Sequence, residues 1–95
     1  MKIVKKEPGK GYYAKEIPNT LEAMQAEVGG YIETVTVDRT CCIVCDEEGR
    51  IKGLPYNTTL DSVDLYGPIF IVGTKGDEFC DVPSIVEYIC VEGQV

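Results

Sequence analysis

Two short runs without a charged side chain, CCIVC (41–45) and IFIVG (69–73), constrain the fold of this chain most strongly. Each run has the length of a strand and ends at a turn-forming segment. Neighbouring side chains of a strand point to opposite faces, so a run that is apolar throughout is typical of a central strand buried on both sides. The sequence therefore predicts a β-sheet with these two runs as central strands.

The N-terminal part of the chain predicts a hairpin followed by a helix. In KIVKKEPGKGYYAKEI, β-branched and aromatic residues flank the turn-forming residues 8–11, which is typical of two paired strands. In PNTLEAMQAEVGG, Asn19 is a candidate N-cap with Glu22 three residues further on. Apolar residues recur there at helical spacing, and Gly29 is the predicted end of the helix.

The middle of the chain predicts a meander. Residues 31–37, YIETVTV, alternate between two faces and predict a strand. Together with CCIVC and residues 51–54, they would form three antiparallel strands over 31–54. Residues 55–68 are irregular, with at most one short helical turn.

The C-terminal segment 82–91 has apolar residues at helical spacing, and Ser84 with Glu87 has the pattern of a capping box, so a helix is preferred over a strand. A chain of 95 residues can bury one core. We expect residues 1–95 to form one α+β domain. It would have a mainly antiparallel sheet of about five strands, with one or two helices on one face.

The charge of the chain disfavours nucleic-acid binding. The net charge is −7, and it is divided between a basic start (five lysines and two acids in residues 1–16) and an acidic remainder (four bases and fourteen acids). Proteins bind nucleic acid mainly by placing Lys and Arg on phosphates. An acidic decoy that mimics nucleic acid stays open. No apolar run is long enough for a membrane helix, and we expect a cytoplasmic protein without a targeting signal.

The absence of histidine from the sequence removes histidine bases, histidine-activated nucleophiles and mixed Cys/His zinc sites. The spacing of Cys42 and Cys45 is that of a zinc knuckle or a redox pair. On a strand, however, these two side chains point to opposite faces. We therefore interpret the cysteines as reduced, buried, small hydrophobes, and predict no metal site and no cofactor.

The candidate binding residues lie in loops and at sheet edges, where binding residues concentrate. The segment GLPYN (53–57) combines turn-forming residues with an aromatic side chain, and the basic start is a candidate docking patch, although turns and a lysine-guarded edge strand explain both. No pattern selects a catalytic residue. The residues that we predict to bind a ligand or a partner are Tyr31, Glu33, Arg50, Tyr56 and Asn57.

Four segments in order, VGGYIE (28–33), CDEEGRIKGLPYN (45–57), IVG (71–73) and DEF (77–79), resemble a small family of unknown function. Its members are short proteins encoded in Gram-positive bacterial, phage and plasmid genomes. The resemblance covers nearly the whole chain and implies no activity and no catalytic residue. The matching positions are Gly29, Gly30, Tyr31, Glu33, Gly49, Gly53, Leu54, Pro55 and Asn57.

The function that we expect is non-enzymatic binding of a protein partner, in a mobile element or its bacterial host. One alternative is a binder of a charged metabolite or nucleotide, with a site at a subunit interface built from the lysine-rich strand. An enzyme is less favoured, because it would need a strongly shifted pKa on a Lys, Tyr, Asp, Glu or Cys in a cleft. The C-terminal segment has fewer charges than the resemblance implies, so a partner surface or a homodimer contact is expected there.

Overall fold

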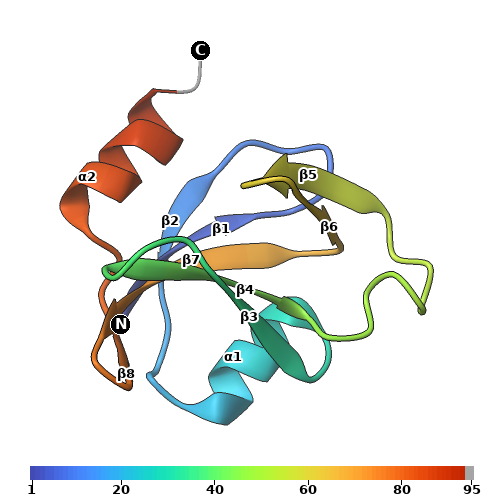
Figure 1. Cartoon of the computed structure of the whole chain (residues 1–95), viewed down its shortest axis with the longest axis horizontal. Coiled ribbons are helices and arrows are strands. Elements are labelled where there is room, and N and C mark those ends of the chain that lie inside the picture. The colour runs from blue at the N-terminus through green and yellow to red at the C-terminus, as the bar shows by residue number, and fades with distance from the viewer. Residues whose placement is uncertain (94–95) are drawn as a thin grey trace.

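The computed structural model describes residues 1–93, which form a six-stranded antiparallel sheet, a separate two-stranded hairpin and two short helical segments (Figure 1). The order in the large sheet is β2-β1-β7-β4-β3, and β8 pairs with the second half of β7. Its strands are β1 (Lys2–Lys6), β2 (Tyr13–Glu16), β3 (Ile32–Thr36), β4 (Cys41–Asp46), β7 (Ile69–Lys75) and β8 (Glu78–Cys80). The remaining elements are β5 (Tyr56–Leu60), β6 (Val63–Tyr66), α1 (Leu21–Val28), α2 (Ser84–Glu87) and the π-helical η1 (Tyr88–Glu92).

The two apolar runs are central strands, as predicted. β4 and β7 pair with each other, and every residue of β4 is buried. Because both strands are apolar on both faces, the sheet carries two clusters of buried side chains, one on each face. One cluster contains Val44 and Phe70, and the other contains Ile43 and Ile71. The expectation of one core was therefore wrong.

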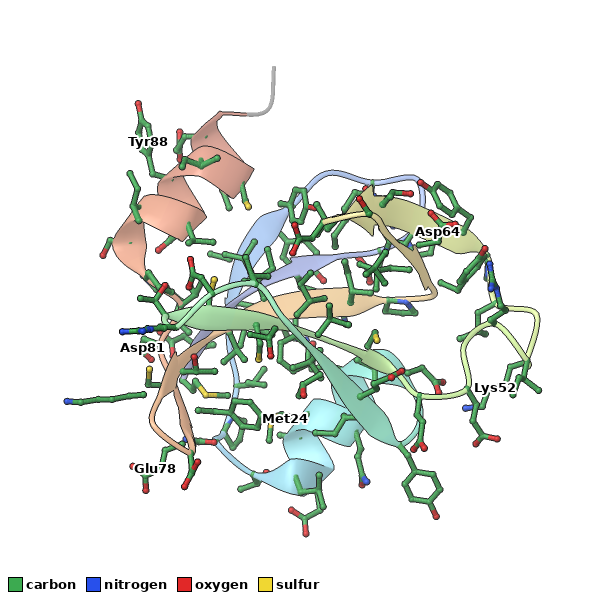
Figure 2. All side chains as sticks on the ribbon, viewed as in Figure 1. Met24, Lys52, Asp64, Glu78, Asp81 and Tyr88 are labelled. Atoms are coloured by element: carbon green, nitrogen blue, oxygen red, sulfur yellow. The ribbon has the colours of Figure 1, made fainter. Side chains whose placement is uncertain are left out.

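Helix α1 covers the first face of the sheet, which carries the cluster with Val44 and Phe70 (Figures 1 and 2). Its residues Met24 and Val28 pack into this cluster. Its N-cap is Thr20, whose Oγ1 accepts a hydrogen bond from the N–H of Ala23 at 3.1 Å. The predicted cap, Asn19, instead donates from its side chain to the backbone of β8. Gly29 ends the helix with φ of 82°, a left-handed conformation that glycine adopts without strain.

The C-terminal segment is helical, as predicted, and lies on the other side of the sheet from α1 (Figure 1). Val86 and Cys90 pack against the second cluster, so the two helices are divided between the two faces, and the expectation that they share one face was wrong. The predicted Ser84–Glu87 capping box is absent, because the N-cap position is Pro83, which has no side-chain donor or acceptor. None of the helices in residues 1–93 is long and apolar enough to cross a membrane. The α+β class and the antiparallel sheet are confirmed.

The prediction for residues 51–68 was wrong in two respects. Residues 51–54 are not a strand, because local bonds such as Lys52 N–H to the Glu48 oxygen (2.9 Å) close them into a loop. Residues 56–66 form the β5–β6 hairpin instead of irregular chain. Asp61 and Ser62 make its turn with φ of 53° and 66°, the pair of positive values that a tight hairpin turn requires.

Candidate functional site

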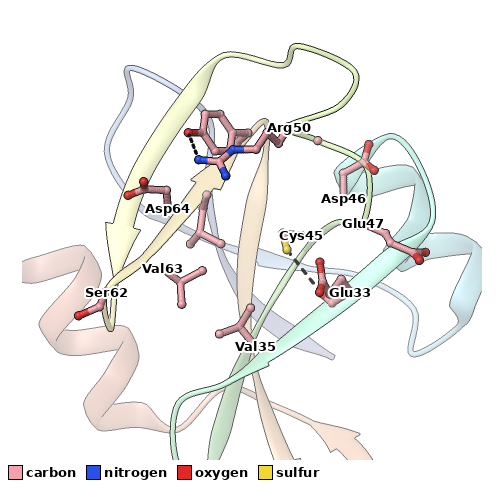
Figure 3. A pocket seen from close by; sticks show the side chains of 12 residues that line it. Glu33, Val35, Cys45, Asp46, Glu47, Arg50, Ser62, Val63 and Asp64 are labelled. Carbon is pink, nitrogen blue, oxygen red and sulfur yellow. Dashed lines mark hydrogen bonds between the residues drawn. The ribbon is translucent and has the colours of Figure 1, made fainter.

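A cleft of about 430 Å³ lies between the β3–β4 edge of the sheet and the β5–β6 hairpin (Figure 3). The hairpin is attached to the second face of the sheet through Leu65, which is 3% exposed. β3 contributes Glu33 and Val35, because residues two apart on a strand face the same side. The loop after β4 contributes Glu47 and Arg50 at one end.

The cleft has an apolar floor and an acidic rim. The apolar residues that line this floor are Val35, Cys45, Val63 and Leu65. Four carboxylates line the cleft, from Glu33, Asp46, Glu47 and Asp64, and Arg50 is the single base among its described lining residues. The Asp64 carboxylate is oriented by the hydroxyl of Thr59, which donates to it at 2.6 Å.

One of these carboxylates is neutralised by a cation of the chain itself. Asp46 is 2% exposed at its side chain, and its Oδ2 lies 2.8 Å from the Lys52 ammonium. Burial by itself raises the pKa of Asp46, but the Lys52 ammonium and the Glu48 N–H reverse this, so that the pKa lies below its ordinary value. Gly30 lies against this ion pair, and a side chain there would collide with both groups. Three exposed carboxylates therefore remain to meet a ligand.

Arg50 is held against an aromatic side chain. Its Nη2 donates to the Tyr66 hydroxyl at 3.1 Å, and its Cζ lies 5.2 Å from the centre of the Tyr66 ring. Tyr56 contacts that ring edge-on, with centroids 5.9 Å apart and planes at 75°. This stack fixes the guanidinium at one end of the cleft and leaves the middle of the rim acidic.

The thiol on the floor is not poised for chemistry. Burial raises the pKa of Cys45 to about 11, with Glu33 and Asp46 adding to the effect, so the thiol stays protonated near neutral pH. Cys42 lies in the cluster on the opposite face, as the alternation predicted, and its pKa is also raised by burial to about 11. In the described part of the chain, no group of three His, Cys, Asp or Glu residues is placed to hold a metal ion.

The five predicted site residues have different places in the structure. Glu33 and Arg50 line the cleft. Tyr56 does not line it, but contacts the Tyr66 ring against which Arg50 is held. Asn57 is buried and bonded within the protein, so its amide faces no ligand. Tyr31 is 67% exposed and is not among the lining residues. Their role in binding stays a prediction.

Sequence reasoning missed Glu47, Val63 and Asp64 as lining residues. Glu47 lies in the turn directly after β4, where Arg50 was the residue predicted to bind. Val63 and Asp64 lie in β6, within the segment 55–68 that was predicted to be irregular. The alternation of Val63 and Leu65 was the one signal that could have shown this strand.

Three of the five lysines in the basic start form ion pairs within the protein. Lys5 and Lys15 both pair with Glu27 on α1, at 3.0 and 2.9 Å, and Lys2 pairs with Glu87 on α2 at 3.4 Å. None of these residues lines the cleft. They connect the β1–β2 hairpin to the helices on both faces.

Comparison with known proteins gives a family and no activity. No curated protein matches the chain, and no solved structure matches it. One family model matches residues 1–91, nearly the entire described chain. The protein therefore belongs to the family described as Domain of unknown function (DUF3846).

Proposed function

We propose that this protein is a non-enzymatic binding protein whose cleft takes a basic segment of a protein partner. The observation that carries the proposal is the lining of the cleft, with four carboxylates and one guanidinium around an apolar floor. Complementary charge selects a partner and speeds its association, and a desolvated apolar floor supplies affinity.

The charge balance of the cleft favours a cationic partner. Asp46 is already paired with Lys52, whereas Glu33, Glu47 and Asp64 are exposed around the floor. Because these three carboxylates outnumber the one guanidinium of Arg50, the cleft has a net negative charge. Arg50 itself is held by Tyr66, where it can bond a backbone carbonyl or a carboxylate of the bound segment.

A protein partner is preferred over a metabolite because the cleft is open and is lined by residues from both sheets. The alternative site at a subunit interface needed free lysines from the basic start, and the structure pairs Lys2, Lys5 and Lys15 internally. A decoy of nucleic acid is also not preferred, because the four carboxylates of the cleft stand beside Arg50 and an apolar lining.

The compartment and the origin of the partner are part of the proposal. We place the protein in the cytoplasm of a Gram-positive bacterium, and its partner among the proteins of a mobile element or of the host. Reduced thiols suit that compartment, and all five cysteines, which lie within the described residues, are free.

Native mass spectrometry of the protein purified gently from such a cytoplasm tests the proposal. We expect a co-purifying polypeptide that dissociates as salt is raised. The double variant Glu33→Gln with Asp64→Asn should lose it. The matched control Glu22→Gln, on the exposed side of α1 away from the cleft, should keep it.

Three results would contradict the proposal. The first is a bound small molecule of a few hundred daltons in place of a polypeptide. The second is a partner that the double variant retains. The third is a chain that is recovered without a partner, as a bare monomer or homodimer, from cells that carry the mobile element in its active state.

A further inference from the structure

Strand β3 is an edge of the large sheet. In residues 1–93 it pairs with β4 on one side, over five residues from Ile32 to Thr36, and with no strand on the other. An edge strand presents backbone N–H and C=O groups on which another extended chain can pair. Of the edge strands β2, β3 and β8, β3 is the one that lines the cleft.

The hydrogen bonds next to β3 show which residues have free backbone groups. The N–H of Val37 donates to the Cys41 oxygen at 3.3 Å, and the N–H of Glu47 donates to the Tyr31 oxygen at 2.9 Å. Hydrogen-bonded and non-bonded pairs alternate along an antiparallel ladder. Glu33 and Val35 therefore direct their backbone groups to β4. The residues that direct theirs outward are Ile32, Thr34 and Thr36.

The edge of β3 has no lysine, proline or bulge, and its one charged side chain, Glu33, lines the cleft. Exposed edges are commonly blunted by lysine, proline or a bulge. The sequence of β3, IETVT, has neither lysine nor proline, and its register with β4 runs without a shift. The opposite edge, β2, contains Lys15, which is tied to Glu27. An edge of β-branched residues without these three features is the one suited to receive another strand.

The same strand lines the cleft. Glu33 and Val35 point from β3 toward the hairpin in Figure 3, and Asp64 lies on the hairpin side. The side chains of a strand added to β3 would alternate between the two faces of the sheet. Every second one would therefore lie on the same face as Glu33, at the open side of the cleft. Basic side chains at those positions would meet the carboxylate rim.

We propose that the partner binds as an extended basic segment that adds a strand to the free edge of β3. Its backbone bonds to Ile32, Thr34 and Thr36, and its alternate Lys or Arg side chains reach Glu33 and Asp64. This inference rests on the proposed function, because it specifies how the same cleft takes its partner.

A synthetic heptapeptide of alternating arginine and threonine, acetylated and amidated, is the probe. Amide hydrogen exchange followed by NMR at low salt, with and without this peptide, gives a readout with internal controls. We expect peptide-dependent protection of the N–H groups of Ile32, Thr34 and Thr36. Those of Glu33 and Val35, already bonded to β4, should change little. Uniform protection, or protection confined to another element, would overturn the inference.

Two N-methylated forms of the peptide separate strand addition from plain charge attraction. Methylation on all threonines and methylation on all arginines leave the charge unchanged but block opposite backbone edges. An antiparallel added strand bonds through the threonine N–H groups, and a parallel one through those of arginine. We expect one form to bind at least about tenfold more weakly than the other. Equal affinities would overturn strand addition and leave the proposed function standing.

Variants of the protein test the same backbone hydrogen bonds as the modified peptides do. Thr34→Pro removes one outward N–H, a change that an edge strand tolerates, and should weaken binding of the peptide about tenfold. Thr34→Val keeps the N–H and should bind as the unmodified protein does. If Thr34→Pro and Thr34→Val bind equally well, strand addition is wrong. If no form of the peptide binds even at low salt, the proposed function fails as well.

Discussion

Glu27 shows at the scale of one residue how the acidic and basic parts of the chain are joined. Its carboxylate lies 3.0 Å from the Lys5 ammonium and 2.9 Å from that of Lys15, at a side chain that is 12% exposed. Burial raises the pKa of Glu27, but the hydrogen bonds from Lys15 and Lys5 outweigh it, and the net shift is downward. The charged form is therefore the one that stabilises the fold.

The variant Glu27→Gln should lower the free energy of unfolding at pH 7 by about 2 kcal/mol, because charge-assisted hydrogen bonds to two ammonium groups are lost. A lowered pKa gives stability that is present above the unfolded value of about 4.3 and is lost as pH falls through the folded value. Urea unfolding should therefore show a difference that shrinks between pH 5 and pH 3. Glu22→Gln is the control, and a pH-independent difference would contradict this account.

Thiol reactivity is a second property of single residues. Burial raises the pKa of Cys42 and Cys45 to about 11, so about one thiol in a thousand is ionised at pH 8. Iodoacetamide at pH 8 should leave both unmodified in the folded protein while it alkylates the less buried Cys80. Peptide mass mapping measures this, with urea-unfolded protein as the control. Rapid labelling of Cys42 in the folded protein would contradict this prediction, because it would show that the cluster beneath α1 opens to solvent.

At the scale of elements, Asn57 connects the β5–β6 hairpin to the sheet. Its Nδ2 donates to the backbone oxygens of Lys6 and Gly67, both at 2.8 Å, and its Oδ1 accepts from the Lys6 ammonium at 2.8 Å. Asn57→Ala should lower the free energy of unfolding by about 3 kcal/mol, because buried polar groups lose their partners. Asn19→Ala, which removes one exposed bond, should cost less than about 1 kcal/mol. Similar losses in a urea titration would contradict this role.

Elements with a strong local pattern could be predicted, and those defined by long-range packing could not. The runs 41–45 and 69–73 and the end of α1 at Gly29 have signals within a few residues. The β5–β6 hairpin has a turn without glycine, and its position depends on Asn57 reaching β1, fifty-one residues away in sequence. For the same reason Glu33 and Arg50 could be chosen as candidates, but the cleft between them could not.

At the scale of the whole molecule, the two central strands belong to both clusters of buried side chains. β4 and β7 place alternate residues on the α1 face and on the hairpin face. Loss of either cluster therefore exposes one face of the same two strands. Because neither layer can lose its cover without exposing this shared sheet, the two faces should unfold together.

Matched substitutions on the two faces test this coupling. Ile3 lies in the cluster on the α1 face and Ile43 in the other, and both are fully buried. Ile3→Val and Ile43→Val should each lower the free energy of unfolding by about 1 kcal/mol. Each should shift one common transition, with far-UV circular dichroism and tyrosine fluorescence coinciding. Two transitions, of which each variant moves only one, would show that the faces of the sheet unfold independently.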